Sequence, residues 1–313
     1  MDASTVDSTL GPAEKPPSEQ AAPAAGAGAA EALRRQINLR WGRYARAYQR
    51  LRAPKPTGEG IHALRVAGRR LRVALRLLES MAHPRQARAL RQRLQATARR
   101  LGPLRDCDVH AGMLQALARR HPTLRPVLQG LRRQRARGMA RLGEYLPARR
   151  LAAQQRRLMR LLRALQAQDA PREAALSAAL VTRLARDQAR VLRALERAQD
   201  GDPRHLHLLR IACKGFRYSL ELALALGAHP GGNAALAQAK SWQGALGNVQ
   251  DWSTLEQRLL RYASRHPGVL APPAVQAVTR RRQAAAQAVL RKARHLPALV
   301  ERAVRQANAR WEH

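Results

Sequence analysis

The sequence contains few aromatic residues and few cysteines, and both shortages limit the kinds of binding site that the protein can form. It has one Phe, five Tyr and four Trp in 313 residues. Because proteins hold single-stranded nucleic acids largely by stacking bases on aromatic rings, a base-stacking surface is poorly supported. We expect Trp41, Trp242 and Trp252, which lie in apolar helical patterns, to belong to the core. Cys107 and Cys213 are far apart and lack metal-ligand spacing, so we expect neither a disulfide framework nor a zinc site.

Long apolar runs and several functional motifs are also missing. No segment approaches the roughly 18 uninterrupted apolar residues that suggest a transmembrane helix. Residues 1–30 lack the basic start and apolar run of a signal peptide. We find no zinc-finger spacing, ribonucleoprotein motif or glycine-rich phosphate loop. The sequence therefore predicts a cytoplasmic protein without a membrane span, a metal or another cofactor.

Acidic residues are scarce relative to basic ones. The chain has 58 Lys and Arg against 21 Asp and Glu, a formal net charge of +37. Such a surplus repels itself unless an anionic partner neutralises it, and the candidates are nucleic acid, polyphosphate or an anionic membrane. A GC-rich genome would explain the preference for Arg over Lys, but it would not explain the excess of bases over acids.

The residues that are abundant, Leu and Ala, indicate an all-α protein. Residues 1–30 are rich in Ala, Pro, Gly and Ser, so we expect a disordered tail. From Glu31 onward, apolar residues recur at helical spacing, and Gly or Pro interrupts them every 15 to 25 residues or so. The pattern predicts about twelve helices, six on each side of Pro171, with breaks that include Gly102–Pro103 and Gly247.

The second part of the chain repeats the first. Residues 61–78 align with residues 206–223, 145 positions later. The same offset carries the segment LGPLRDCDV, at 101–109, onto LGNVQDWST at 246–254. Two separate motifs with one offset indicate a tandem duplication. We therefore expect two helical bundles, residues 31–168 and 171–313, related by a pseudo-twofold axis.

Each copy carries basic residues along one face of a helix. At about 100° per residue, five basic residues of 61–78, namely His62, Arg65, Arg69, Arg72 and Arg76, fall within an arc of about 80°, apart from a broad apolar face. Shorter stripes at spacing i, i+3, i+7 precede them in both copies. In the second copy Glu221 replaces the last basic residue. The stripes contain His62, Arg65, Arg69, Arg72 and Arg76; His207, Arg210, Lys214 and Arg217; Arg43, Arg46 and Arg50; and Arg190, Arg193 and Arg197.

These stripes suit an extended chain of phosphates. Each guanidinium can donate two parallel hydrogen bonds to phosphate oxygens. The alternative is that the arginines form an ordinary solvated helix face. Recurrence in both copies, without Glu at i+4 to pair with the arginines, favours the phosphate hypothesis.

The repeated histidines and aspartates leave alternatives open. His62 and His207 could donate to phosphate oxygens, or they could cap or pack the start of their helices. Asp106 and Asp251 are expected to be structural, either capping the next helix or pairing with a buried arginine. A hydrolytic metal site would need more carboxylates, and the second copy has Ser253 where the first has Asp108. We predict no catalytic residues.

The combination of motifs resembles the CHAD family, named for a conserved histidine α-helical domain. The resemblance is carried by HALRVAGRRLR at 62–72, LGPLRDCDV at 101–109, HLLRIACKGFRYSLE at 207–221 and LGNVQDWSTL at 246–255. It implies two helical bundles in pseudo-twofold arrangement, a central groove or channel lined with basic residues, and binding of inorganic polyphosphate. It adds Lys240 to the phosphate-binding candidates, although Gln95 stands opposite it in the first copy.

The sequence thus predicts a protein that binds inorganic polyphosphate without catalysis. The alternative is a nucleic-acid-binding protein that uses the same charge without regard to base sequence. A third hypothesis is an accessory protein of polyphosphate storage granules, or a processing enzyme. The alternating glutamates of the triphosphate-hydrolysing domain that accompanies some relatives are absent, so hydrolysis is not expected.

Overall fold

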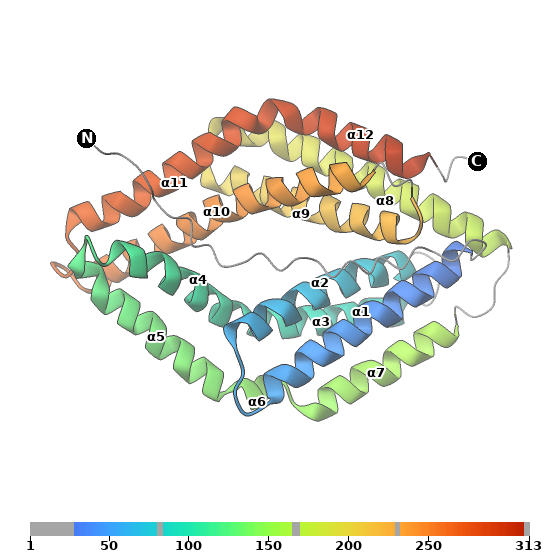
Figure 1. The fold of residues 1–313 in the computed structure, drawn as a ribbon, viewed down its shortest axis with the longest axis horizontal. Helices are drawn as coiled ribbons and strands as arrows, with labels where there is room; N and C mark the ends of the chain where they lie inside the picture. The colour runs from blue at the N-terminus through green and yellow to red at the C-terminus, as the bar shows by residue number, and fades with distance from the viewer. Residues whose placement is uncertain (1–27, 80–83, 165–169, 229–231, 310–313) are drawn as a thin grey trace.

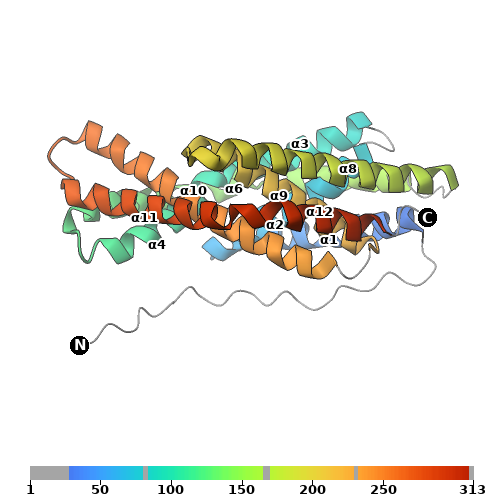
Figure 2. The same ribbon diagram turned by 90° about the horizontal axis from the view of Figure 1, so that it is seen from above.

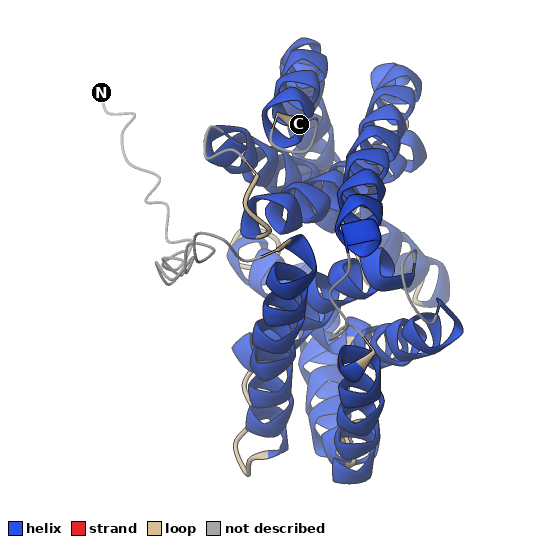
Figure 3. Ribbon diagram, turned by 90° about the vertical axis from the view of Figure 1, so that its right-hand side faces the viewer, coloured by secondary structure: helices blue, strands red, loops and turns tan. Residues whose placement is uncertain are grey.

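The protein is helical throughout the residues that the structure describes, 28–79, 84–164, 170–228 and 232–309. The structure is a computed structural model. These residues form twelve α-helices and three short 3-10 turns, and they contain no strand (Figure 3), which confirms the predicted all-α class. The α-helices are α1 (Ala29–Arg52), α2 (Gly58–Glu79), α3 (Pro84–Arg100), α4 (Gly102–Leu117), α5 (Arg125–Ala140), α6 (Leu142–Tyr145), α7 (Ala148–Arg163), α8 (Ala170–Arg197), α9 (Pro203–Ala225), α10 (Gly232–Arg265), α11 (Pro272–Lys292) and α12 (Leu296–Asn308).

The helices form two parts that meet along the middle of the molecule. In Figure 1, α1–α7 occupy the lower part and α8–α12 the upper part, and most helices run along the long axis (Figure 2). In the lower part α1 packs on α2, α2 on α3, α3 on α7, and α4 on α5. In the upper part α8 packs on α9, α9 on α10, and α10 on both α11 and α12. The packing order of the two parts is therefore the same.

The predicted distribution of helices is wrong at two positions. The described chain has seven α-helices before residue 165, because α5 and α6 are separated at Arg141, and five after it, because α10 continues through Gly247 without a break. The corresponding stretch of the lower part is divided into α3 and α4. Pro103 explains the difference: it has no backbone N–H and its ring clashes with the preceding turn, whereas Asn248 stands at the aligned position. Glycine alone does not end a helix here.

The N-terminal boundary also differs from the prediction. Helix α1 begins at Ala29, and the side chain of Ala30 is 2% exposed, so the last residues assigned to a tail belong to the fold. Residues 1–27, the rest of that tail, lie outside the described residues. So do residues 165–169, where the predicted boundary between the two halves falls.

Two apolar clusters hold the helices together. The larger one joins both parts and contains residues of α1, α2, α3, α7, α8, α9, α10 and α12. The smaller one lies at one end, where Cys107 and Leu114 of α4 pack with Leu255 and Leu259 of α10. Trp41 is buried, and Trp242 and Trp252 pack against the larger and the smaller cluster respectively. Both cysteines are buried and free.

Helix α2 is fixed against α1 by its apolar face, and this orients its basic residues. Ile61, Leu64, Leu71 and Leu75 are all buried. At Gly68 a Cβ atom would lie 3.3 Å from the ring of Tyr44, so glycine allows α1 to approach closely. No described helix has the length and apolar character required to span a membrane.

Candidate anion-binding site

The basic faces of α2 and α9 meet between the two parts of the molecule. The helices pack against each other, and Arg69 Nη1 of α2 donates a hydrogen bond of 3.1 Å to the hydroxyl of Tyr218 on α9. The guanidinium of Arg217 lies over the Tyr218 ring, with its Cζ atom 3.8 Å from the centroid of the ring. Residues far apart in sequence therefore share one cationic region.

Five half-buried bases form what we call the central cluster: Arg65, Arg69, Arg72, Arg210 and Lys214. Burial, and then the neighbouring charges of Arg69, Arg210 and Arg65, together lower the pKa of Lys214 to about 6. Burial also lowers the pKa of Arg65, with contributions from Arg69 and Arg210. Because these influences cross from α2 to α9, the two helices hold their charges close together.

The charge of the central cluster is not neutralised within the described chain. None of its five members forms a salt bridge there. Arg65 donates to the carbonyl oxygen of Ala98, and Arg69 donates to a neutral hydroxyl. The Nε atoms of Arg72 and Arg210 are buried without a hydrogen-bond partner. Unpaired buried donors are costly, and an anion that accepts from them would remove that cost.

Two carboxylates lie beside the cluster without pairing with it. Burial raises the pKa of Asp106 and of Asp251, while Arg65 and Arg210 respectively are the strongest influences in the opposite direction. Asp106 lies inside α4 and Asp251 inside α10, so the predicted capping of a following helix is wrong. The other structural alternative was pairing with a buried arginine. Arg65 and Arg210 influence the two carboxylates electrostatically, but no ion pair between described residues joins them.

The geometry offers no metal centre within the described residues. No group of three or more His, Cys, Asp or Glu side chains there is arranged to hold a metal ion. Asp108, the closest additional carboxylate in sequence to Asp106, is engaged by Arg135 of α5.

Arg217 belongs to a buried ion-pair network and not to the central cluster. Its side chain is 4% exposed; Nη1 lies 2.9 Å from Glu221 and Nε donates to Gln243 at 2.7 Å. Glu221 also forms a salt bridge with Arg70 of α2 at 2.6 Å, which links the two parts of the molecule. Glu221 stands four residues after Arg217, so the expectation that no Glu at i+4 pairs with the stripe arginines is wrong for the second copy.

The two histidines occupy the starts of α2 and α9. His207 is half-buried and its Nδ1 forms a hydrogen bond with the side chain of Gln250 on α10. His62 is exposed. At the position aligned with Gln250 the first copy has Arg105, so the two histidines have different candidate neighbours.

The remaining candidates lie outside the central cluster. Arg76 adjoins it, since its charge contributes to lowering the pKa of Arg72. Arg190 pairs with Asp187 at 3.3 Å. Arg43 contributes to the lowered pKa of the buried Arg40. No hydrogen bond or ion pair between described residues ties the others to the cluster; they are all exposed, and they are Arg46, Arg50, Arg193, Arg197 and Lys240.

The structure adds residues that the sequence analysis did not select. Arg105 and Arg258 influence the pKa of Asp106, and Tyr218 accepts from Arg69. Neither Arg105 nor Arg258 recurs in the other copy, because Gln250 and Met113 stand at the aligned positions. The position of Arg105 within the repeated motif LGPLRDCDV was the one feature of the sequence that could have marked it as a site residue.

Comparisons with known proteins agree with this architecture. The structure is similar to the crystal structure of the CHAD domain from the plant Ricinus communis, with a TM-score of 0.66 and 24% identity, over 90% of this chain and 94% of that one. It is also similar to PptA from Streptomyces chartreusis, with a TM-score of 0.54 and 18% identity, over 92% of this chain and 100% of that one. No curated protein sequence matches the chain.

These similarities establish the fold, and the sequence itself establishes the family. The CHAD domain family model matches residues 35–260, which covers more than half of the chain and all four repeated motifs. The described helices, the order in which they pack and the motifs that carry the basic residues are all consistent with that match. The chain therefore belongs to the CHAD domain family.

Proposed function

We propose that the protein binds inorganic polyphosphate at the central cluster and does not catalyse a reaction there. The observation that carries this proposal is the group of five half-buried bases on α2 and α9 that have no salt-bridge partner in the described chain. Concentrated charge of one sign, with buried donors left unpaired, favours a ligand that supplies many anionic oxygens in a small volume. Polyphosphate has this property, and polyphosphate binding is known in the CHAD family.

The spacing of the bases fits a chain of linked phosphates. Arg65 and Arg72 are seven residues apart on α2, about 10 Å along the helix axis, and Arg210 and Lys214 approach from α9. A flexible phosphate chain can follow such a row and receive donors from both sides. In this proposal the space between the two helices is the basic groove, and Arg76 extends it along α2.

The decisive experiment removes the charge and keeps the fold. In the variant R65Q/R69Q/R210Q/K214Q we expect affinity for long-chain polyphosphate to fall at least about 100-fold, because each charge-assisted hydrogen bond contributes about 1.5–3 kcal/mol. Circular dichroism should show unchanged helicity. The matched control is R119Q/R120Q/R261Q/R265Q, which removes four exposed charges elsewhere. Equal affinities of the two variants in calorimetric titration would refute the proposal.

Nucleic-acid binding is the competing use of the same charge. We expect long-chain polyphosphate to displace double-stranded DNA from the protein when both are supplied at equal phosphate concentration. The half-buried cluster suits a thin chain better than a duplex, whose phosphates lie on a wide cylinder. Displacement of polyphosphate by DNA would favour the alternative.

The absence of a catalytic role is tested directly. Incubation with polyphosphate and Mg²⁺ or Mn²⁺ should release no phosphate above a protein-free control. Cytoplasmic localisation on polyphosphate granules is part of the same proposal. Fluorescence microscopy of the tagged protein, with and without the four central substitutions, would test it.

A further inference from the structure

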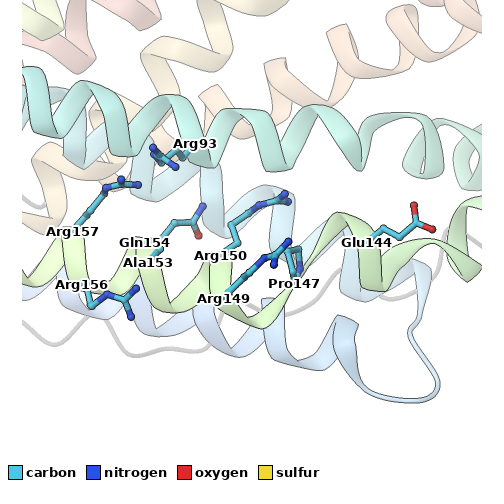
Figure 4. Close-up of a pocket in the computed structure, with 9 residues that line it drawn as sticks. All are labelled: Arg93, Glu144, Pro147, Arg149, Arg150, Ala153, Gln154, Arg156 and Arg157. Atoms are coloured by element: carbon cyan, nitrogen blue, oxygen red, sulfur yellow. The ribbon is translucent and has the colours of Figure 1, made fainter.

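Two cavities lie away from the central cluster, on the outer helices. The first, about 720 Å³ in volume, lies between α3 and α7, and we call it the α3–α7 pocket. Figure 4 shows Arg93 reaching toward it from one helix and the other basic residues from the helix opposite. Five of its nine lining residues are arginines: Arg93, Arg149, Arg150, Arg156 and Arg157.

The positive charge of this pocket is largely unopposed. Its one acidic lining residue, Glu144, already pairs with Arg141 at 3.0 Å. Within the described chain, none of the five arginines forms an ion pair with an acidic residue, and Arg150 donates to the carbonyl oxygen of Tyr145. Burial and then the charge of Arg93 lower the pKa of Arg157, so arginines of the two helices lie close enough to repel each other.

A buried amide lines the same pocket and lacks a partner. Gln154 is 1% exposed, and its Oε1 accepts from the hydroxyl of Tyr44 at 3.5 Å. Its Nε2 has no hydrogen-bond partner. In Figure 4 the Gln154 side chain stands between Arg150 and Arg157. The pocket therefore combines unopposed cations with an unused donor, both of which an anionic oxygen would satisfy.

The second cavity is the counterpart of the first in the other half. It has a volume of about 590 Å³ and lies between α10 and the segment of α11 and α12 that includes Lys292, Arg294, His295 and Arg302. At the offset of 145 residues, Arg149 aligns with Arg294, Arg150 with His295, Arg157 with Arg302, and Arg93 with Gln238. We call it the α10–α12 pocket. No acidic residue is among those that line it.

We propose that the α3–α7 pocket is a second binding site for condensed phosphate, separate from the central cluster, and that the α10–α12 pocket is its weaker counterpart. Arg149 and Arg157 are about 12 Å apart along the axis of α7, a row that several linked phosphates can occupy and a single carboxylate cannot. The second pocket has Gln238 in place of Arg93 and Leu299 in place of Gln154, so it offers fewer donors.

The test uses a short phosphate chain that one pocket can hold. Tripolyphosphate is titrated calorimetrically into wild type, R93Q/R149Q/R157Q and the matched control R119Q/R120Q/R265Q. We expect the pocket variant to lose one binding event, or to bind it at least about tenfold more weakly, while the control matches wild type. R294Q/R302Q should remove a weaker binding event at the α10–α12 pocket. Tripolyphosphate should then no longer change the fluorescence emission of Trp242, which lines that pocket.

Repeating the titrations in the R65Q/R69Q/R210Q/K214Q background separates this proposal from the central site. If tripolyphosphate still binds to the two outer pockets in that background, and this binding disappears with the pocket substitutions, the outer sites exist independently of the central cluster. If the pocket variant binds tripolyphosphate like the control in both backgrounds, the proposal is overturned. It is overturned equally if the pocket arginines affect binding of double-stranded DNA but not of tripolyphosphate.

Discussion

Lys214 is an amine whose charge depends on what lies beside it. In the free protein its pKa is about 6, chiefly because of burial and then because of Arg69, Arg210, Arg65 and Arg217. Asp251 is the facing acid that feels its charge. A bound phosphate would favour the ammonium form and raise the pKa toward its ordinary range. Binding of polyphosphate is therefore linked to uptake of a proton.

We expect proton uptake of up to one per protein at pH 7 to 8. Below pH 6 Lys214 is already protonated, so affinity is greatest there; as pH rises above 6, affinity should fall by at most about tenfold per pH unit. Calorimetry in buffers of different ionisation enthalpy measures the uptake. Long polyphosphate chains should be used, because their few terminal phosphates then contribute little to the measured proton uptake. The variant K214M should lose the uptake, and an unchanged value would contradict the assignment.

Glu221 neutralises buried and half-buried arginine charges. It pairs with Arg70 and Arg217, and it favours the charged form of Arg40, which is 5% exposed. In E221Q the buried Arg217 keeps its charge without a counterion, so we expect the free energy of unfolding to fall by about 3–5 kcal/mol. Denaturant titration followed by circular dichroism measures it.

The control for that substitution is E144Q. The pair of Glu144 with Arg141 is exposed, with both side chains 62% accessible. Water screens such a pair, so its loss should cost less than about 1 kcal/mol. If the two variants were equally stable, the network around Glu221 would not be a buried one.

At the scale of helices, Gly247 provides a test of the continuity of α10. Nothing lies within 4 Å of the position its Cβ would take, and the helix runs on in both directions. G247A should therefore raise the free energy of unfolding by about 0.5–1 kcal/mol. G201A is the opposite control, because Gly201 has φ of 71° and ends a 3-10 turn, so alanine should destabilise the protein there. Destabilisation by G247A would mean that α10 bends at that residue.

The sequence predicts elements better than it predicts their partners. Helical periodicity and Leu–Ala composition are enough for the all-α class, because they depend only on neighbouring residues. The predicted break at Gly247 was wrong because it was attributed to glycine, whereas the break in the first copy is caused by Pro103. For the site, periodicity places Arg65, Arg69 and Arg72 on one face of their helix. It does not reveal that Glu221 binds Arg217, since burial decides that pairing.

The molecule as a whole should respond to salt in opposite ways with and without ligand. Its net charge of +37 makes the free chain repel itself, so added salt should raise its melting temperature by screening. Polyphosphate raises the melting temperature by binding the folded state, but salt weakens that binding. Differential scanning fluorimetry across salt concentrations should show the gain from polyphosphate shrinking steadily. A gain independent of salt would argue against an electrostatic complex.

The unbroken course of α10 also determines how the end of the molecule can move. Over 34 residues, about 51 Å, it packs into both apolar clusters, so its two ends move as one body. Across the interface, Pro103 removes a hydrogen bond between α3 and α4. We therefore expect any opening of that end to be one-sided, with α4 and α5 tilting about residue 101 and carrying Arg105 and Asp106, while Asp251 and Arg258 stay in place.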